Sequence, residues 1–266
     1  TSGSDNEQTT AIPLEQQMTK MLKGKKFIYC ADAGLGSFNI RNFNSMGGRA
    51  FIVTQSIKKL SDPLKEAVFN DFDYRLLSTD EPVSLEHMKN FDRFDKTNEG
   101  LYNDRAYKVL TADRAIDTGL YEEKVCKNGK VRNVKSKAVL KQKIIISFSR
   151  KMMEYQRYIR NRQIERAKKL LKSLDPETYK KGPHDVTRFI KRTSSTKSGE
   201  KINDRYELDQ SVIDEEEKYD GLYAVCTNLE DDVQKIVEVN HHRWEIEDSF
   251  RIMKSEFKSR PVYHSR

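Results

Sequence analysis

One stretch near the end of the chain carries acidic and basic residues at spacings that suit chemistry on phosphates. The stretch is HHRWEIEDSFRIMK, residues 241–254, and it holds the only tryptophan. At about 100° per residue, Arg243, Glu247 and Lys254 fall on one stripe of a helix. A carboxylate is a hard ligand for Mg²⁺, and flanking cations hold phosphate oxygens. The alternative is an ordinary surface ion pair between Arg243 and Glu247, worth about 0.3–0.5 kcal/mol.

An apolar arc runs beside this stripe and predicts the face by which the helix packs on its core. The arc consists of Val239, Ile246, Phe250, Met253 and Phe257. The charged stripe also takes in Asn240 and Arg251, so Glu247 is expected at the edge of the core, between cations.

A second carboxylate, Asp32, follows directly on the apolar run KFIYCA, residues 26–31. In an open α/β sheet, ligands gather at the carboxyl ends of the strands. Gly34 and Gly36 in DAGLGS carry no side chain and leave room for close approach. The alternative is an aspartate that caps the next helix or forms an Asx turn. Dinucleotide binding is disfavoured, because GLGSFN lacks the third glycine of that fingerprint.

The elements that must position these residues can be read from the apolar pattern. The run 26–31, a short helix over 38–46 and the buried run RAFIVTQ (49–55) predict a β-α-β unit with parallel strands. Further along, the sequence predicts a hairpin over 125–134, a strand over 141–149, a helix over 150–174, a loop over 193–201, an antiparallel hairpin from YELDQSVID to LYAVCTN, and a helix capped by Asn228 that runs to about Phe257.

Charge and cysteine usage indicate the kind of partner and compartment. The 266 residues carry a net charge of +8 and a pI of about 9.2, which favours a polyanionic partner, nucleic acid first. Three widely spaced cysteines without a CxxC pair argue against a disulfide framework or a zinc knuckle. Because every apolar run is far shorter than the ~20 residues that cross a bilayer, we expect a soluble cytoplasmic chain.

The predicted helix over 150–174 carries many basic residues interleaved with tyrosines. Arg160 and Arg166 are the positions at which we expect it to contact DNA phosphates. The alternative is a solvated helix face, with Met152, Ile159 and Ala167 turned inward.

Several segments resemble one known family, the bacterial insertion-sequence transposases of the DDE class. They are GSDNEQTT, FIYCADAGLGSFNIRNFNSMGGRAFIVTQ, DGLYAVCTN and RWEIEDSFRIMKSEFKSRPVY. The signature Tyr-x2-Arg-x3-Glu-x6-Lys marks the last catalytic helix of that family. Arg243, Glu247 and Lys254 match it in register, whereas Asn240 stands at the position of the tyrosine. The resemblance covers the start and the end of the chain, and the middle only in general character.

The resemblance implies metal-dependent phosphoryl transfer, with Asp32 as the second catalytic aspartate and Glu247 as the catalytic glutamate. Two Mg²⁺ ions, or Mn²⁺ in their place, would be held by three carboxylates. Such a pair, about 3.5–4 Å apart, stabilises the attacking and leaving oxygens of an in-line displacement. The family's first aspartate is expected on a strand before GSDNEQTT, outside this chain. We therefore expect a catalytic-core fragment with little or no activity.

The expected fold class is α/β: a ribonuclease H-like mixed sheet with flanking helices, interrupted by an inserted α+β module. Residues 1–56 and 206–266 would form the two parts of the catalytic core, and 57–205 the insertion. The implied partners are the element's terminal inverted repeats, target double-stranded DNA and a second copy of the chain in a synaptic homodimer, at the bacterial nucleoid and without a membrane. Two alternatives stay open: a nuclease of this fold without strand transfer, and a catalytically silent DNA-binding accessory protein.

Overall fold

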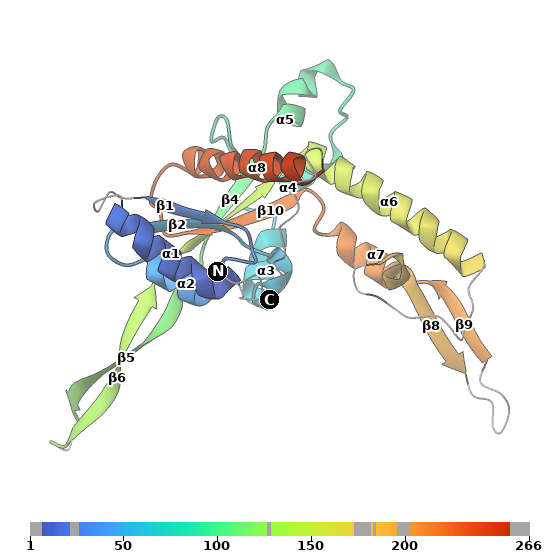
Figure 1. Ribbon diagram of the computed structural model, residues 1–266. Coiled ribbons are helices and arrows are strands. Elements are labelled where there is room, and N and C mark those ends of the chain that lie inside the picture. The colour runs from blue at the N-terminus through green and yellow to red at the C-terminus, as the bar shows by residue number, and fades with distance from the viewer. Residues whose placement is uncertain are drawn as a thin grey trace. The chain divides into compact units, whose positions relative to one another are not determined.

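The computed structural model is a mixed α/β protein whose largest sheet has six strands and is flanked by helices (Figure 1). The structure describes residues 7–21, 27–126, 129–172, 182, 185–195 and 203–255. The α-helices are α1 (Glu7–Met21), α2 (Phe38–Asn44), α3 (Asp62–Phe69), α4 (Leu85–Asn90), α5 (Glu99–Asn103), α6 (Arg150–Lys172), α7 (Gln210–Glu217) and α8 (Val233–Ser255). The 3-10 helices are η1 (Ile57–Lys59), η2 (Lys96–Asn98) and η3 (Val186–Phe189).

Ten strands form three sheets among the described residues. They are β1 (Ile28–Ala31), β2 (Ala50–Thr54), β3 (Arg75–Leu76), β4 (Ala106–Thr111), β5 (Arg114–Val125), β6 (Val131–Leu140), β7 (Lys143–Phe148), β8 (Ile190–Ser195), β9 (Asn203–Leu208) and β10 (Leu222–Thr227). The large sheet has the order β1-β2-β10-β7-β4-β3, and β5-β6 and β8-β9 are separate two-stranded sheets.

The first two strands form the predicted β-α-β unit. β1 pairs with β2 in parallel, with Ala31 beside Val53, and α2 connects them. β10 then pairs with β2 in the opposite direction, with Val225 opposite Thr54. The sheet is therefore mixed, and the prediction of parallel pairing over 26–55 is confirmed.

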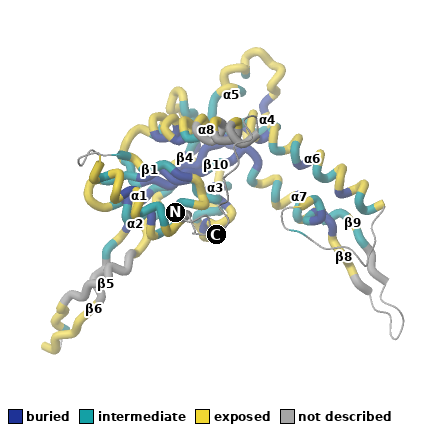
Figure 2. The backbone as a smooth tube through the Cα atoms, in the orientation of Figure 1, coloured by how far each residue is buried: buried dark blue, intermediate teal, exposed yellow. Residues whose placement is uncertain are grey.

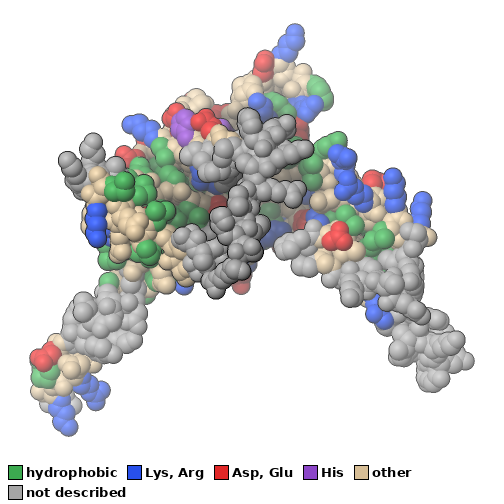
Figure 3. Space-filling view, in the orientation of Figure 1, with side chains coloured by type: hydrophobic (Ala, Val, Ile, Leu, Met, Phe, Trp, Pro, Cys, Tyr) green, Lys and Arg blue, Asp and Glu red, His purple; other side chains and the backbone are tan. Residues whose placement is uncertain are grey.

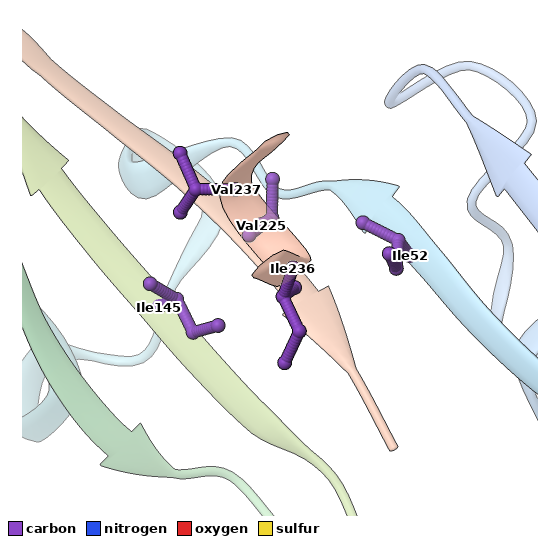
Figure 4. Packing of buried hydrophobic residues seen from close by; sticks show 5 residues of the cluster. All are labelled: Ile52, Ile145, Val225, Ile236 and Val237. Atoms are coloured by element: carbon purple, nitrogen blue, oxygen red, sulfur yellow. The ribbon is translucent and has the colours of Figure 1, made fainter. Parts of the chain in front are cut away.

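Burial explains why the central strands read as nearly continuous apolar runs. β2, β7 and β10 consist mainly of buried residues (Figure 2). On one face of the sheet, Ile236 and Val237 of α8 pack against side chains of three strands (Figure 4). Those strand residues are Ile52, Ile145 and Val225. Strands covered on both faces need apolar residues at successive positions rather than at alternate ones.

The predicted hairpin between YELDQSVID and LYAVCTN is wrong. β9 pairs with β8 instead, with Ile190 opposite Leu208, and the following residues form α7. A helix turns Ile213 into a buried cluster with Ala167 and Phe189, which an alternating strand pattern did not reveal. Burial of an apolar stripe against α6 thus outweighs the local strand signal.

The last helix begins later than predicted. Asn228 does not cap it, because its Oδ1 accepts a hydrogen bond from the Phe51 N–H at 2.9 Å. α8 starts at Val233, and the Asp232 carboxylate accepts from the Gln234 N–H at 3.1 Å. Val239, predicted in the core spine, is 36% exposed.

Two compact units make up the chain. One comprises 1–82, 107–146 and 223–266, and the other comprises 83–106 and 147–222. These boundaries differ from the predicted ranges 1–56, 57–205 and 206–266. β3, β4 and β7 fall within 57–205 and pair into the large sheet, because strand pairing joins segments that are far apart in sequence.

Glu15 of α1 carries a buried carboxylate. The residue is 4% exposed. Burial raises the pKa of the Glu15 carboxyl, against the opposing influence of Asn44 and Arg49. The folded state therefore binds a proton more tightly than the unfolded state does. Stability is full below the unfolded pKa and declines as the pH rises through the folded pKa.

Replacing Glu15 with glutamine is expected to raise the free energy of unfolding at pH 7 by roughly 1–3 kcal/mol. The gain should shrink as the pH falls below the ordinary carboxyl pKa, where Glu15 of the unsubstituted protein is protonated in both the folded and the unfolded state. Urea denaturation at pH 7 and pH 4 measures it. Glu66→Gln, at an exposed position of α3, is the control and should change little. An equal or lower stability of Glu15→Gln at pH 7 contradicts the prediction.

Candidate functional site at the carboxyl ends of β1 and β2

Asp32 lies directly after β1, as predicted, and is exposed. Its Oδ1 accepts a hydrogen bond from the Leu35 N–H at 3.0 Å, which is the geometry of an Asx turn. No described residue donates a hydrogen bond to Oδ2. The turn and a ligand role are therefore compatible, because the turn occupies one oxygen and leaves the other at the surface.

The loop after Asp32 is held close to β2. A Cβ added at Gly34 would lie 3.2 Å from the Asp32 Oδ1, and one at Gly36 would lie 3.2 Å from the Val53 Cβ. Both glycines therefore allow the close approach that the sequence suggested. Arg41 of α2 fastens the loop, since its Nε donates to the Gly36 carbonyl oxygen at 2.9 Å.

The parallel register brings the ends of the two strands level. Ala31 pairs with Val53, so the next positions, Asp32 and Thr54, both lie at the carboxyl ends. A hydroxyl from β10 joins this edge: the Thr54 Oγ1 and the Tyr223 phenol oxygen are 2.7 Å apart. Three strands thus contribute polar groups at the carboxyl ends of β1 and β2.

α8 adds two more groups from above the same edge, and it contacts both β1 and β2. The Asn240 Nδ2 donates to the Tyr223 hydroxyl oxygen at 3.3 Å, and the Arg243 Nη2 donates to the Thr54 Oγ1 at 3.5 Å. Asn240 is 5% exposed, so it occupies a place in the packed interface rather than on the surface. The guanidinium of Arg243 is therefore held at the carboxyl end of β2.

The neighbouring titratable groups keep their protons at neutral pH. Burial raises the pKa of the Cys30 thiol, and the charge of Arg243 acts in the opposite direction. Burial, with the nearby charges of Glu15 and Asp32, raises the pKa of Tyr29 to about 12. Neither a thiolate nor a phenolate is thus expected beside Asp32.

Four predicted site residues lie on α8, and three of them have side chains outside the described part of the chain. These three are Glu247, Arg251 and Lys254. The helical backbone continues through all three positions, and Glu247 follows Arg243 by four residues, about one turn. Within the described residues, no cluster of three or more His, Cys, Asp or Glu side chains that could hold a metal ion occurs.

Arg160 requires a correction. Its side chain is buried, and its Nη1 and Nη2 donate to the two carboxylate oxygens of Asp220 at 2.6 and 2.7 Å. Glu217 accepts a further bond from Nη2 at 3.1 Å. A guanidinium engaged in this way does not face a DNA backbone. The sequence placed it on a solvated face because its partners lie about sixty positions away along the chain.

Other parts of α6 agree with an exposed basic surface. Arg166 is exposed, as predicted. The inward face is formed by Met153, Arg160 and Ala167, so Met153 and not Met152 is the buried methionine. The exposed cations on this helix are Lys151, Arg157, Arg162, Arg166, Lys168, Lys169 and Lys172.

Sequence reasoning missed three residues of the strand-end site. They are Arg41, Thr54 and Tyr223. Thr54 is a polar residue directly after three buried ones, and that position is the signal that could have identified it. Arg41 and Tyr223 carry no comparable signal in the sequence.

No model of a known protein family fits the sequence, and no curated protein matches it. Among the described helices, none is long and apolar enough to pass through a bilayer.

Proposed function

We propose that this chain is the catalytic core of a metal-dependent DNA transposase with a ribonuclease H-like fold. The proposed reaction is cleavage at the ends of an insertion sequence, followed by transfer of the freed strand into target DNA. One observation carries the proposal: Arg243 of α8 reaches the carboxyl end of β2, beside the strand end that bears Asp32. A helix and two parallel strands then meet where α/β sheets hold their ligands.

Asp32 and Glu247 are the two carboxylates that the proposal assigns to metal binding. Side chains alternate along a strand, so the position of Asp32, one residue past β1, continues the face of Cys30, which packs against the core cluster that includes Ile236 and Val237 of α8. Glu247 follows Arg243 by about one helical turn, on the side of the helix that carries Asn240. Convergence of Asp32 and Glu247 at this edge would create a hard-oxygen site for Mg²⁺ or Mn²⁺.

The structure of the Asp32 loop fits a metal ligand. The Leu35 N–H fixes the carboxylate through Oδ1, which leaves Oδ2 for another contact. Gly34 keeps a side chain away from the carboxylate, since a Cβ there would lie 3.2 Å from Oδ1 and 3.8 Å from Oδ2. Bound divalent ions would supply activation of water or of a 3′-hydroxyl and stabilise charge on the phosphate.

The chain's own residues have separate roles in this proposal. Asp32 and Glu247 hold the ions, and Arg243, Arg251 and Lys254 hold the phosphate oxygens of the DNA. Thr54 orients the Arg243 guanidinium through its hydroxyl. Arg166 and the other exposed cations of α6 contribute to DNA affinity, and a net charge of +8 agrees with a polyanionic partner. A homodimer would bring two DNA ends together.

Iron-directed cleavage tests the site. Fe²⁺ bound in place of Mg²⁺, with ascorbate and peroxide, generates radicals that cut only nearby backbone. Cuts are expected both near Asp32 and near Arg243 to Glu247, because one ion would contact both segments. Added double-stranded DNA should be cut at the bound phosphate, and excess Mg²⁺ should suppress all the cuts.

Variants of the two carboxylates make the test specific. Asp32→Asn and Glu247→Gln should each abolish both sets of cuts, whereas Asp62→Asn, an exposed carboxylate on α3, should abolish neither. Mass spectrometry of the fragments measures the positions. Cuts at one segment alone, or cuts that survive Asp32→Asn, would show that the two carboxylates do not share an ion and would overturn the proposed function.

A further inference from the structure

The β5-β6 ribbon contains a cross-strand pair that is unfavourable for the ribbon itself. The register places Lys124 directly opposite Arg132, and both side chains are exposed. Like charges at directly opposed positions of an antiparallel pair are destabilising. The ribbon forms a sheet separate from the six-stranded sheet of its unit, so neighbouring strands do not compensate for this repulsion (Figure 1).

A third cation joins the same face. The Cys126 N–H donates to the Lys130 carbonyl oxygen at 2.8 Å, which extends the ladder to the tip. Because side chains alternate along a strand, Lys130 and Arg132 share a face with Lys124. Blue side chains are visible at the end of the ribbon in Figure 3. Val125 and Val131 oppose each other on the other face.

The second ribbon of the molecule shows the ordinary arrangement. In β8-β9, Lys191 lies opposite Glu207, so opposite charges face each other. Such a pair stabilises its ribbon, whereas the pair of Lys124 and Arg132 weakens its own. A cationic rung on an exposed ribbon becomes favourable when a polyanion lies against it.

The root of the β5-β6 ribbon is fixed beside the candidate site. The Arg114 guanidinium lies 4.4 Å from the centre of the Phe38 ring, at the start of α2 and six positions after Asp32. The Gln142 N–H donates to the Asp113 carboxylate at 3.2 Å, and its Nε2 donates to the Ala112 carbonyl oxygen at 2.8 Å. The ribbon is thus anchored at the start of α2, which follows the loop that carries Asp32.

We propose that the β5-β6 ribbon is a DNA-binding arm that lies against double-stranded DNA through its cationic face. This inference rests on the proposed function, which supplies the duplex. The major groove of B-DNA admits a two-stranded ribbon, and Lys124, Lys130 and Arg132 contact phosphates at its rim. The arm holds the duplex while the phosphate backbone of the DNA reaches Asp32 at the carboxyl end of β1.

Replacing the unfavourable pair by threonines tests the arm without endangering the fold. In Lys124→Thr/Arg132→Thr, the repulsion is removed and two residues of high strand propensity are introduced, so the thermal midpoint should stay unchanged or rise. Affinity for a duplex should fall about tenfold or more, and the slope of log K against log salt should become shallower by about 1.8, since each phosphate contact contributes about 0.9.

A matched control separates the arm from a general effect of charge. Lys191→Thr/Lys218→Thr also removes two positive charges, at exposed positions of the other unit. Its slope should equal that of the native chain. An unchanged slope in the ribbon variant, or equal slopes in both variants, would overturn the DNA-binding arm.

The metal experiment is independent of this result. If the ribbon variant loses DNA affinity and the iron cuts persist in Asp32→Asn, the DNA-binding arm is supported and the proposed catalytic site is contradicted. If the iron cuts require Asp32 and the ribbon variant keeps the native salt dependence of DNA binding, the catalytic site is supported and the DNA-binding arm is contradicted.

Discussion

Arg160→Met is expected to lower the free energy of unfolding by about 3–5 kcal/mol, because it leaves a buried carboxylate without its main partner. Arg160 and Asp220 are each 5% exposed at their side chains and form a bidentate pair. Arg157 lies 3.5 Å from the same carboxylate, but its side chain is about half exposed, so it compensates only in part. Urea denaturation followed by circular dichroism measures the change.

The double variant Arg160→Met/Asp220→Leu shows where that loss originates. Replacing a buried ion pair by apolar groups of similar volume is often neutral or stabilising, so the double variant should recover most of the lost stability. Glu217 remains able to reach solvent, since its side chain is 48% exposed. A loss below about 1 kcal/mol in the single variant would mean that water reaches Asp220 and that the pair contributes little.

Gly221→Ala is expected to cost roughly 2–5 kcal/mol, from backbone strain and steric conflict together. Gly221 has a φ of +76°, in the region that L-residues avoid. A Cβ there would lie 2.6 Å from a ring carbon of Phe148 and 2.8 Å from the Ser149 carbonyl oxygen. The Gly221 N–H also donates to the Gln156 side chain at 2.7 Å, so the backbone cannot move away without losing that bond.

Gly129 provides the control for the backbone contribution. Its φ is +73°, nearly the same, but a Cβ built there meets nothing within 4 Å. Gly129→Ala should therefore cost about 1–2 kcal/mol, the strain alone. The difference between the two variants, measured by denaturation under the same conditions, reports the packing around Gly221. Equal losses would show that Phe148 and Ser149 give way easily.

Local pattern was sufficient for the part of the fold that carries Asp32. A short apolar run, a turn with two glycines and a second buried run predicted β1, α2 and β2, because burial on both faces of a sheet demands consecutive apolar residues. The same reasoning predicted the long helices α6 and α8 and the β5-β6 hairpin. Their ends were less accurate: α8 starts at Val233, since Asn228 bonds to the backbone of β2 instead.

Local pattern failed where a residue's partner lies far away in sequence. Arg160 is a charged residue in a strongly basic helix, which predicts a solvated position, and its burial follows only from its pairing with Asp220. The segment that forms α7 has the alternation of a strand, and only the apolar surface of α6 favours the helix. In both cases the decisive energy comes from contacts that sequence spacing does not reveal.

Residue types and their spacing are enough to identify the two carboxylates of the proposed site: one directly after a buried strand, and one among cations on the last helix. The tertiary structure decided which groups meet. It brought Thr54, Tyr223, Asn240 and Arg243 from two strands and one helix into a single hydrogen-bonded edge. The physical reason is that residue type and period are local properties, whereas the partner of a polar group depends on how strands pair and on which helix covers them.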